Sequence, residues 1–271
     1  AEDNSGSSNV SKLKTHLNNY ATGLNARLQT ALVGCTSATD SGPKAGSVKV
    51  NEPRIEIIYC MNAMELPCQW AGFEAGDRLE KQALKFGNPN RLGTTFAGFL
   101  GAYDKIADKP TDAEAEDWLN NGLSGIDYNA QNDPFLMAPI TTHSQDVSGN
   151  PDYRVYYVTD VTGTDAFAYD LQVALPQEFY QVNIIPDQGP GEEEPPPDTV
   201  EERDVKAFID TRALFFIGKG VLRRDRWEAA KLGGSFIVTI DQTDASQLDI
   251  VVPVNIVKPW AKTSLVVQKQ G

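Results

Sequence analysis

The stretch DAFAYDLQVALPQEFYQVNII, residues 165–185, decides the predicted fold because it holds two segments with the composition of β-strands. The segments at 165–175 and 178–185 are rich in aromatic and β-branched residues, and the Pro-Gln pair between them is a turn signal. The preceding segment DYRVYYVTDV, 152–161, has the same composition. Three such segments in succession predict an antiparallel meander.

The sequence after this meander continues the β pattern. VKAFID (205–210), ALFFIG (213–218), GGSFIVTID (233–241) and SQLDIVVPVNIVKPW (246–260) are each expected to be strands, with a short helix at RRDRWEAAK (223–231). The fold class predicted is therefore α+β, with an antiparallel β-sandwich or barrel over residues 146–271.

The N-terminal half is predicted to be mostly helical from 13 to 145, after a polar arm at 1–12. One amphipathic helix is expected to start at Leu13 and to end at Gly34, because apolar residues recur every three or four positions. Further helices are expected at 75–86, 94–107 and 112–123, and a strand near 54–60. The first helix packs on the rest of the chain or joins a coiled coil, so its apolar seam is a candidate interface between copies: Leu13, Leu17, Tyr20, Leu24 and Leu28.

An acidic insert, PDQGPGEEEPPPDTVEERD at 186–204, interrupts the predicted sheet. Its eight acids and one base account for more than half of the chain's net charge of −13. Three consecutive prolines and the like charges favour an extended loop that stands away from the body. Such a loop suits contact with a basic neighbour or repulsion of DNA, and its candidate residues are Glu192, Glu193, Glu194, Glu201 and Glu202.

Positive charge is clustered only around Lys219, Arg223, Arg224 and Arg226, where it alternates with Asp225 and Glu228. This pattern favours a solvated or inter-subunit ion-pairing face over nucleic-acid binding. We therefore expect no specific nucleic-acid recognition. No apolar run reaches the length of a membrane span and no signal peptide is visible, so a soluble protein is expected.

Common catalytic constellations are missing from the sequence. It contains neither a phosphate-binding P-loop nor a nucleophile elbow, and GLSGID lacks the required spacing. Its two histidines are His16 and His143, of which only the second, with Asp146 nearby, offers even a weak general base. The three cysteines have no C-x-x-C spacing and are expected to be reduced and buried, with a bridge between Cys60 and Cys68 as the alternative. We expect no enzyme activity, no cofactor and no metal.

The segments at 165–185 and 233–260 resemble the tube proteins of tailed-phage tails and related injection machines. This resemblance implies a small β-barrel with a flanking helix, assembly into stacked rings, and an electronegative bore. It makes Asp241, Asp244 and Asp249 candidates for the bore. The expected function is a virion structural protein that assembles in the host cytoplasm with copies of itself and with other virion proteins.

Two alternatives remain open. One is a major or minor capsid shell protein. The other is a carbohydrate- or protein-binding β module, for which five aromatic residues could form a stacking face: Tyr153, Tyr156, Tyr157, Phe179 and Tyr180.

Overall fold

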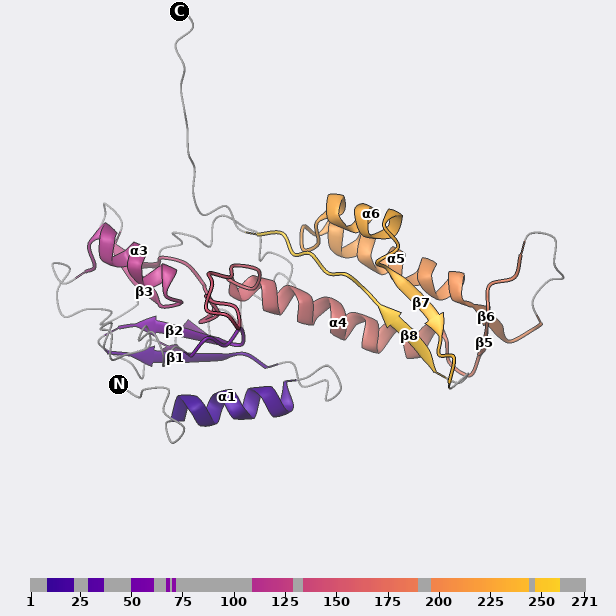
Figure 1. The fold of residues 1–271 in the computed structure, drawn as a ribbon, viewed down its shortest axis with the longest axis horizontal. Helices are drawn as coiled ribbons and strands as arrows, with labels where there is room; N and C mark the ends of the chain where they lie inside the picture. Colours follow the sequence, from indigo (N-terminus) through magenta and orange to yellow (C-terminus); the bar gives the residue numbers. More distant parts are fainter. Residues whose placement is uncertain are drawn as a thin grey trace, which may run out of the picture. The chain divides into compact units, whose positions relative to one another are not determined.

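The computed structural model describes residues 9–21, 29–36, 50–60, 67–68, 70–71, 109–128, 134–189, 196–243 and 247–258 (Figure 1). The chain forms two compact units. The N-terminal unit comprises Ala1–Thr162 with Lys258–Gly271, and the C-terminal unit comprises Gly163–Val257.

The N-terminal unit is built on a four-stranded sheet in the order β1-β2-β3-β4. The strands are β1 (Ala31–Cys35), β2 (Ile55–Tyr59), β3 (Ser124–Tyr128) and β4 (Pro134–Leu136). The first three are parallel, and β4 is antiparallel to β3. The strand predicted at 54–60 is confirmed as β2, whose first four residues are all buried, as expected for a parallel strand covered on both faces.

Helix α1 (Asn9–Tyr20) packs against this sheet through Val10 and Leu17, which join a buried cluster with Ile55, Ile57 and Trp118. The predicted N-terminal helix is thus confirmed in part. It begins within the predicted arm, so residues 9–12 are helical, and Leu32 lies on β1 instead of on the helix. The stretch ALVGC forms a strand here because it pairs with β2.

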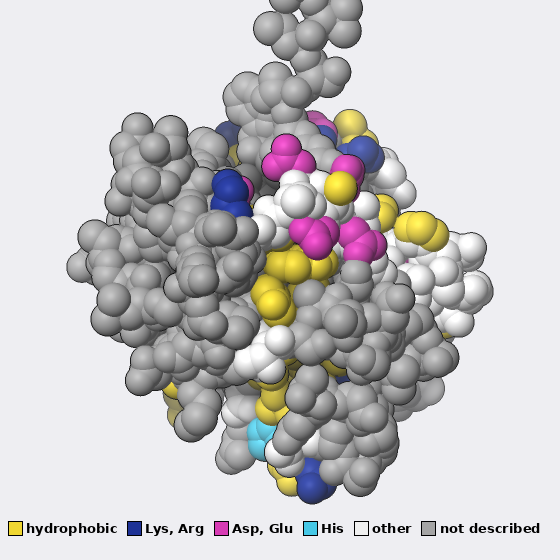
Figure 2. All heavy atoms as spheres, turned by 90° about the vertical axis from the view of Figure 1, so that its left-hand side faces the viewer, with side chains coloured by type: hydrophobic (Ala, Val, Ile, Leu, Met, Phe, Trp, Pro, Cys, Tyr) yellow, Lys and Arg dark blue, Asp and Glu magenta, His cyan; other side chains and the backbone are white. Residues whose placement is uncertain are grey.

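Helix α3 (Asp112–Asn120) confirms the helix predicted near 112–123. Thr111 caps it, and the Glu114 side chain reaches back to the Thr111 N–H, which forms a capping box. Figure 2 shows acidic side chains gathered in the upper part of the face, where Figure 1 places α3. The helices predicted at 75–86 and 94–107 lie outside the described residues.

The first two predicted strands of the meander are wrong, because most of 152–175 belongs to helix α4 (Val158–Glu178). Phe167 and Leu171 are buried one turn apart, with Ala166 and Ala168 beside Phe167, so helical spacing outweighs the aromatic and β-branched content. Gly163 lets the helix approach its neighbours, since a Cβ there would lie 3.1 Å from the Ile256 Cδ1.

The strands predicted at 205–210 and 213–218 are also wrong, because both lie in helix α5 (Glu202–Gly218). Its buried side chains are spaced by three or four residues and include Val205, Ile209, Ala213 and Phe216. Rings of Phe167 and Phe216 pack edge to face at 5.1 Å, and those of Phe179 and Phe208 at 5.4 Å, so α4 and α5 are antiparallel neighbours.

The acidic insert connects two parallel strands, β5 (Asn183–Ile185) and β6 (Thr199–Glu201). Two parallel neighbouring strands need a connection of about a dozen residues, because the chain must return to the starting end of the first strand. This requirement explains why a long insert lies between β5 and β6. The insert is also shorter than predicted, because 199–201 are strand and 202–204 are the first turn of α5.

The end of the C-terminal unit contains α6 (Arg224–Leu232) and the hairpin β7 (Ile237–Ile240) with β8 (Leu248–Val251). The helix is confirmed. The hairpin is confirmed in part, because β8 ends at Val251 and residues 252–258 of the strand predicted at 246–260 belong to no named strand. Strand β7 packs on α5. The predicted sandwich or barrel is nevertheless wrong. The described part of the C-terminal unit has two separate two-stranded sheets, one of them parallel, and helices form most of its core.

Candidate functional site

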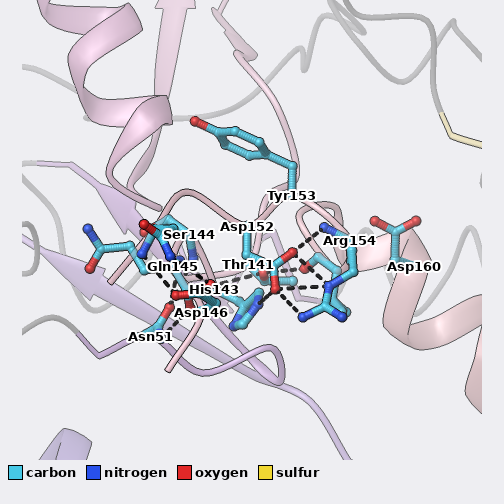
Figure 3. Close-up of polar contacts among 12 residues, drawn as sticks. Asn51, Thr141, His143, Ser144, Gln145, Asp146, Asp152, Tyr153, Arg154 and Asp160 are labelled. Atoms are coloured by element: carbon cyan, nitrogen blue, oxygen red, sulfur yellow. Dashed lines mark hydrogen bonds and ion pairs between the residues drawn. The ribbon is translucent and has the colours of Figure 1, made fainter. Parts of the chain in front are cut away.

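A hydrogen-bonded polar loop in the N-terminal unit, residues 141–154, is shown in Figure 3. Asn51, just before β2, fixes this loop to the sheet. Its Nδ2 donates to the Gln145 carbonyl at 2.8 Å, and its Oδ1 accepts from the N–H groups of Ser144 and Gln145 at 3.0 and 3.1 Å. Asn51 has a φ of 43°, a backbone conformation that asparagine tolerates better than most residues.

Asp152 is the centre of the charged part of the loop and is buried. Its carboxylate accepts from the Arg154 Nη2 at 2.7 Å, from the Arg154 backbone N–H at 3.0 Å and from the His143 Nε2 at 3.2 Å. These bonds, with those from Arg154 the strongest, hold the pKa of Asp152 well below its ordinary range. The carboxylate therefore stays charged and ties the two sides of the loop together.

The geometry around His143 is that of a structural contact. Asp146, the acid predicted to support it, instead accepts from the backbone N–H groups of Ser148 and Asn150 at 2.8 and 2.9 Å. The Ser144 hydroxyl is buried and has no hydrogen-bond partner within the described residues, so it is not activated by the imidazole. His143 and its neighbours do not form a nucleophile–base pair.

Asp160, buried in the first turn of α4, anchors the returning C-terminal segment. The Lys258 Nζ lies 3.4 Å from its carboxylate and donates to the Tyr153 carbonyl at 2.6 Å. Burial raises the pKa of Asp160, which the ion pair with Lys258 partly offsets. Asn51, Asp152 and Lys258 were missed in the sequence because their partners are distant along the chain or give no local pattern.

The predicted α1 seam is divided by the structure. Leu17 is buried and Leu13 is partly buried against the core of the same unit, whereas Tyr20 is exposed beside the His16 ring at 4.8 Å. Leu24 and Leu28 lie outside the described residues. The seam residues that can be placed thus pack mainly on their own chain, and a contact with another copy stays a prediction.

The acids of the predicted projecting loop have different environments. Glu201 is buried and pairs with Arg203, while Glu202 accepts from the Ile240 N–H at 2.6 Å and ties α5 to the hairpin. Glu192, Glu193 and Glu194 lie outside the described residues. Glu201 and Glu202 serve the fold at the start of α5, where negative charge is favourable.

The predicted basic cluster lies at the start of α6. Arg223, Arg224 and Arg226 are exposed, and Arg223 makes a two-bonded contact with Asp225, its Nε and Nη2 at 3.1 and 2.6 Å from the carboxylate. This is an ion-pairing surface of the kind predicted, and contact with a second copy stays a prediction.

The candidate bore residues lie on or beside the hairpin. Asp241 follows β7 and accepts from the Thr243 N–H at 2.6 Å, and Asp249 is exposed on β8. Asp244 lies outside the described residues. Their placement at a hairpin agrees with the sequence, while their exposure to a bore stays a prediction.

The aromatic residues considered as a stacking face are divided, since Tyr153 and Tyr180 are exposed and the other three are half-buried. Tyr156 contacts Tyr153 and Tyr157 edge to face at 5.3 and 5.0 Å, and Phe179 packs on Phe208 at 5.4 Å. Their geometry favours internal packing over binding of a flat ligand.

The cysteines and the surface give no sign of a metal or membrane site in the parts of the chain that the structure covers. Cys35 and Cys60 are buried free thiols, and burial next to Cys35 raises the pKa of Cys60 to about 12, whereas Cys68 is exposed against expectation. Among the described side chains no group of three His, Cys, Asp or Glu could hold a metal ion. The described helices include none long and apolar enough to span a membrane.

Comparison with known proteins gives matches at the level of structure. No family model and no curated protein matches the sequence. A chain from the baseplate of an anti-feeding prophage matches with a TM-score of 0.53 and 15% identity, over 89% of this chain and 60% of the other.

Two further matches are sheath structures. A contracted sheath complex of the extracellular contractile injection system PVC gives a TM-score of 0.62 and 15% identity, over 95% of this chain and 68% of the other. A sheath tail protein from Listeria innocua gives a TM-score of 0.54 and 12% identity, over 94% of this chain and 52% of the other. The chain shares the fold of these sheath structures. It spans between about half and two thirds of the length of the matched chains.

Proposed function

We propose that this chain is a structural subunit of a contractile, phage-tail-like particle, with the role of a sheath subunit. The observation that carries the proposal is a shared fold across 94–95% of the chain with two sheath structures. The sequence led instead to a tube subunit, on the basis of a predicted β-barrel that the described residues do not form. A sheath role keeps the expected self-association and the expected contact with other particle proteins, and it requires no catalytic group.

The charge distribution supports a role in assembly. The described surface exposes both acids and bases, and His143 and Asp152 hold a loop instead of activating a nucleophile. A sheath subunit must make many identical contacts with its neighbours, and exposed complementary charge favours selective contacts.

The test is electron microscopy of the purified chain, alone and with a tube protein from the same source. Rings or helical sheaths about a tube support the proposal. A chain that remains monomeric at high concentration, alone and with the tube protein, contradicts it. Closed shells would favour the capsid alternative, and smooth narrow tubes formed by this chain alone would favour the tube role.

A further inference from the structure

The C-terminal unit has two ends that are defined by the antiparallel pair α4 and α5. The Phe179 and Phe208 rings meet near one end at 5.4 Å, and Phe167 and Phe216 meet near the other at 5.1 Å. The first end therefore holds the end of α4 and the start of α5. The second holds the end of α5, from which the chain passes through Lys219 into α6. With 17 residues, α5 separates these ends by about 25 Å.

The first end is acidic. Exposed carboxylates there are Glu178, Asp187, Asp198 and Asp204. Asp187 and Asp204 accept from backbone N–H groups at the start of α5, at 2.7 and 3.1 Å. Glu178 and Asp198 have no side-chain partner among the described residues.

The base nearest in sequence to these acids is already occupied, since Arg203 pairs with the buried Glu201. Glu178 also lies in the last turn of α4, where the helix dipole disfavours a carboxylate. A carboxylate at position 178 therefore does not stabilise α4.

The second end is basic. Lys219 is the C-cap residue of α5, and its Nζ lies 5.5 Å from the centre of the Phe215 ring. Lys219 forms no ion pair with a carboxylate among the described side chains. At the start of α6, Asp225 is shared by Arg223 at 2.6 Å and Arg226 at 4.0 Å, and Arg224 has no partner within the described chain. Cations in the first turn of a helix oppose its dipole, so these arginines also do not serve their own helix.

We propose that the acidic end of this unit binds the basic end of the same unit in a second copy, head to tail. The two ends cannot meet within one chain because the rigid helix α5 holds them apart. Glu178, Asp198 and Arg224 have no side-chain partner among the described residues, and Arg226 has only the long contact of 4.0 Å with Asp225. These four charges become partners between copies. A contact between two different surfaces of identical chains repeats into a ring or a helical array. The inference rests on the proposed function, since it assumes that the chain assembles.

The experiment uses two charge-reversed forms of the full chain. The acid-end variant carries Glu178→Lys and Asp198→Lys, and the base-end variant carries Arg224→Glu and Arg226→Glu. Each variant alone would place like charges at every contact, so the concentration needed for assembly should rise about tenfold or more in sedimentation experiments. In an equimolar mixture every contact between unlike variants again joins opposite charges. The mixture should therefore assemble at about the wild-type concentration.

Neutral variants provide the matched control and guard against a reversed variant that does not fold. Glu178→Gln with Asp198→Asn, and Arg224→Gln with Arg226→Gln, should each weaken assembly less than the reversals do. Their mixture should stay below the wild type, because only every second contact in an alternating array joins opposite charges. Reversed variants that assemble as the wild type does, or a mixture no better than its components, would overturn the head-to-tail contact and leave the sheath role intact. A wild-type chain that assembles under no condition would overturn both.

Discussion

Gly122 occupies a position that another residue cannot fill without strain. Its φ is +75°, and a Cβ there would lie 2.8 Å from the backbone carbonyl oxygen of Thr142. Gly122→Ala should lower the free energy of unfolding by about 2–4 kcal/mol, because it combines an unfavourable backbone with a clash against a main chain. Urea denaturation measures the change.

Gly149 provides the matched control, since its φ is +83° but nothing lies within 4 Å of a Cβ there. Gly149→Ala should lower the free energy of unfolding by only about 1 kcal/mol, because the positive φ is its one unfavourable feature. An equal loss of unfolding free energy in the two variants would show that the close approach of Thr142 does not destabilise Gly122→Ala.

The pH dependence of stability should depend on Asp152. Its folded-state pKa is depressed, mainly by the hydrogen bonds from Arg154, so its contribution is full above the ordinary carboxyl pKa of about 4 and is lost as the pH falls through the lower folded value. Asp152→Asn should therefore reduce stability at pH 7 by about 1–2 kcal/mol and flatten the loss of stability below pH 4. Urea denaturation at pH 7 and at pH 3 gives the comparison.

Glu178→Gln is the control for this prediction, because Glu178 is exposed and has no side-chain partner in the described chain. It should not flatten the loss of stability below pH 4. If Asp152→Asn loses as much unfolding free energy between pH 7 and pH 3 as the wild type does, the Asp152 carboxylate is not the cause of the pH dependence.

At the scale of elements, α5 tests the correction from strand to helix. Ile209 is completely buried on its inner face, whereas Leu214 is 38% exposed on the other side. Ile209→Ala should cost about 2–5 kcal/mol of unfolding free energy, and Leu214→Ala well under half of that. Similar costs at both positions would contradict the helical spacing, as measured by denaturant unfolding followed by circular dichroism.

The charges of α6 give a second test at this scale. Arg224 is in the first turn, so Arg224→Glu should stabilise the chain by about 0.3–1 kcal/mol through the helix dipole. Lys231 is in the last turn and its Nζ lies 3.1 Å from the Asp210 carboxylate, so Lys231→Glu should destabilise by about 1 kcal/mol or more. A loss of stability in Arg224→Glu would show that Arg224 is bound within its own chain.

The elements also show what the sequence could predict. Helices α3 and α6, strand β2 and the β7–β8 hairpin follow from caps, alternation and turn residues, which are local signals. Helices α4 and α5 were taken for strands because of their aromatic and β-branched residues, although Phe167 with Leu171, and Val205 with Ile209, are four residues apart. The polar loop was missed because Asn51 reaches Gln145, 94 positions away, and no local pattern encodes such a pair.

At the scale of the whole molecule, the chain carries a net charge of −13, and the described part of the C-terminal unit exposes acids at one end and bases at the other. General repulsion between copies and specific attraction between unlike ends therefore act together. Salt screens both, with a Debye length of about 10 Å at 0.1 M that falls to about 3 Å at 1 M. The attraction between the charges at the contact is also weakened, because solvent and salt reach these exposed side chains.

Assembly should consequently weaken with added sodium chloride. The concentration at which assemblies form should rise several-fold between about 0.05 and 0.5 M salt in the wild type, and the equimolar mixture of reversed variants should show the same slope. The neutral variants should show a flatter response because the attracting charges are gone. Assembly that strengthens with salt in the wild type would instead indicate a contact governed by apolar surface, for which exposed Phe215 and Tyr169 would be the residues to replace next.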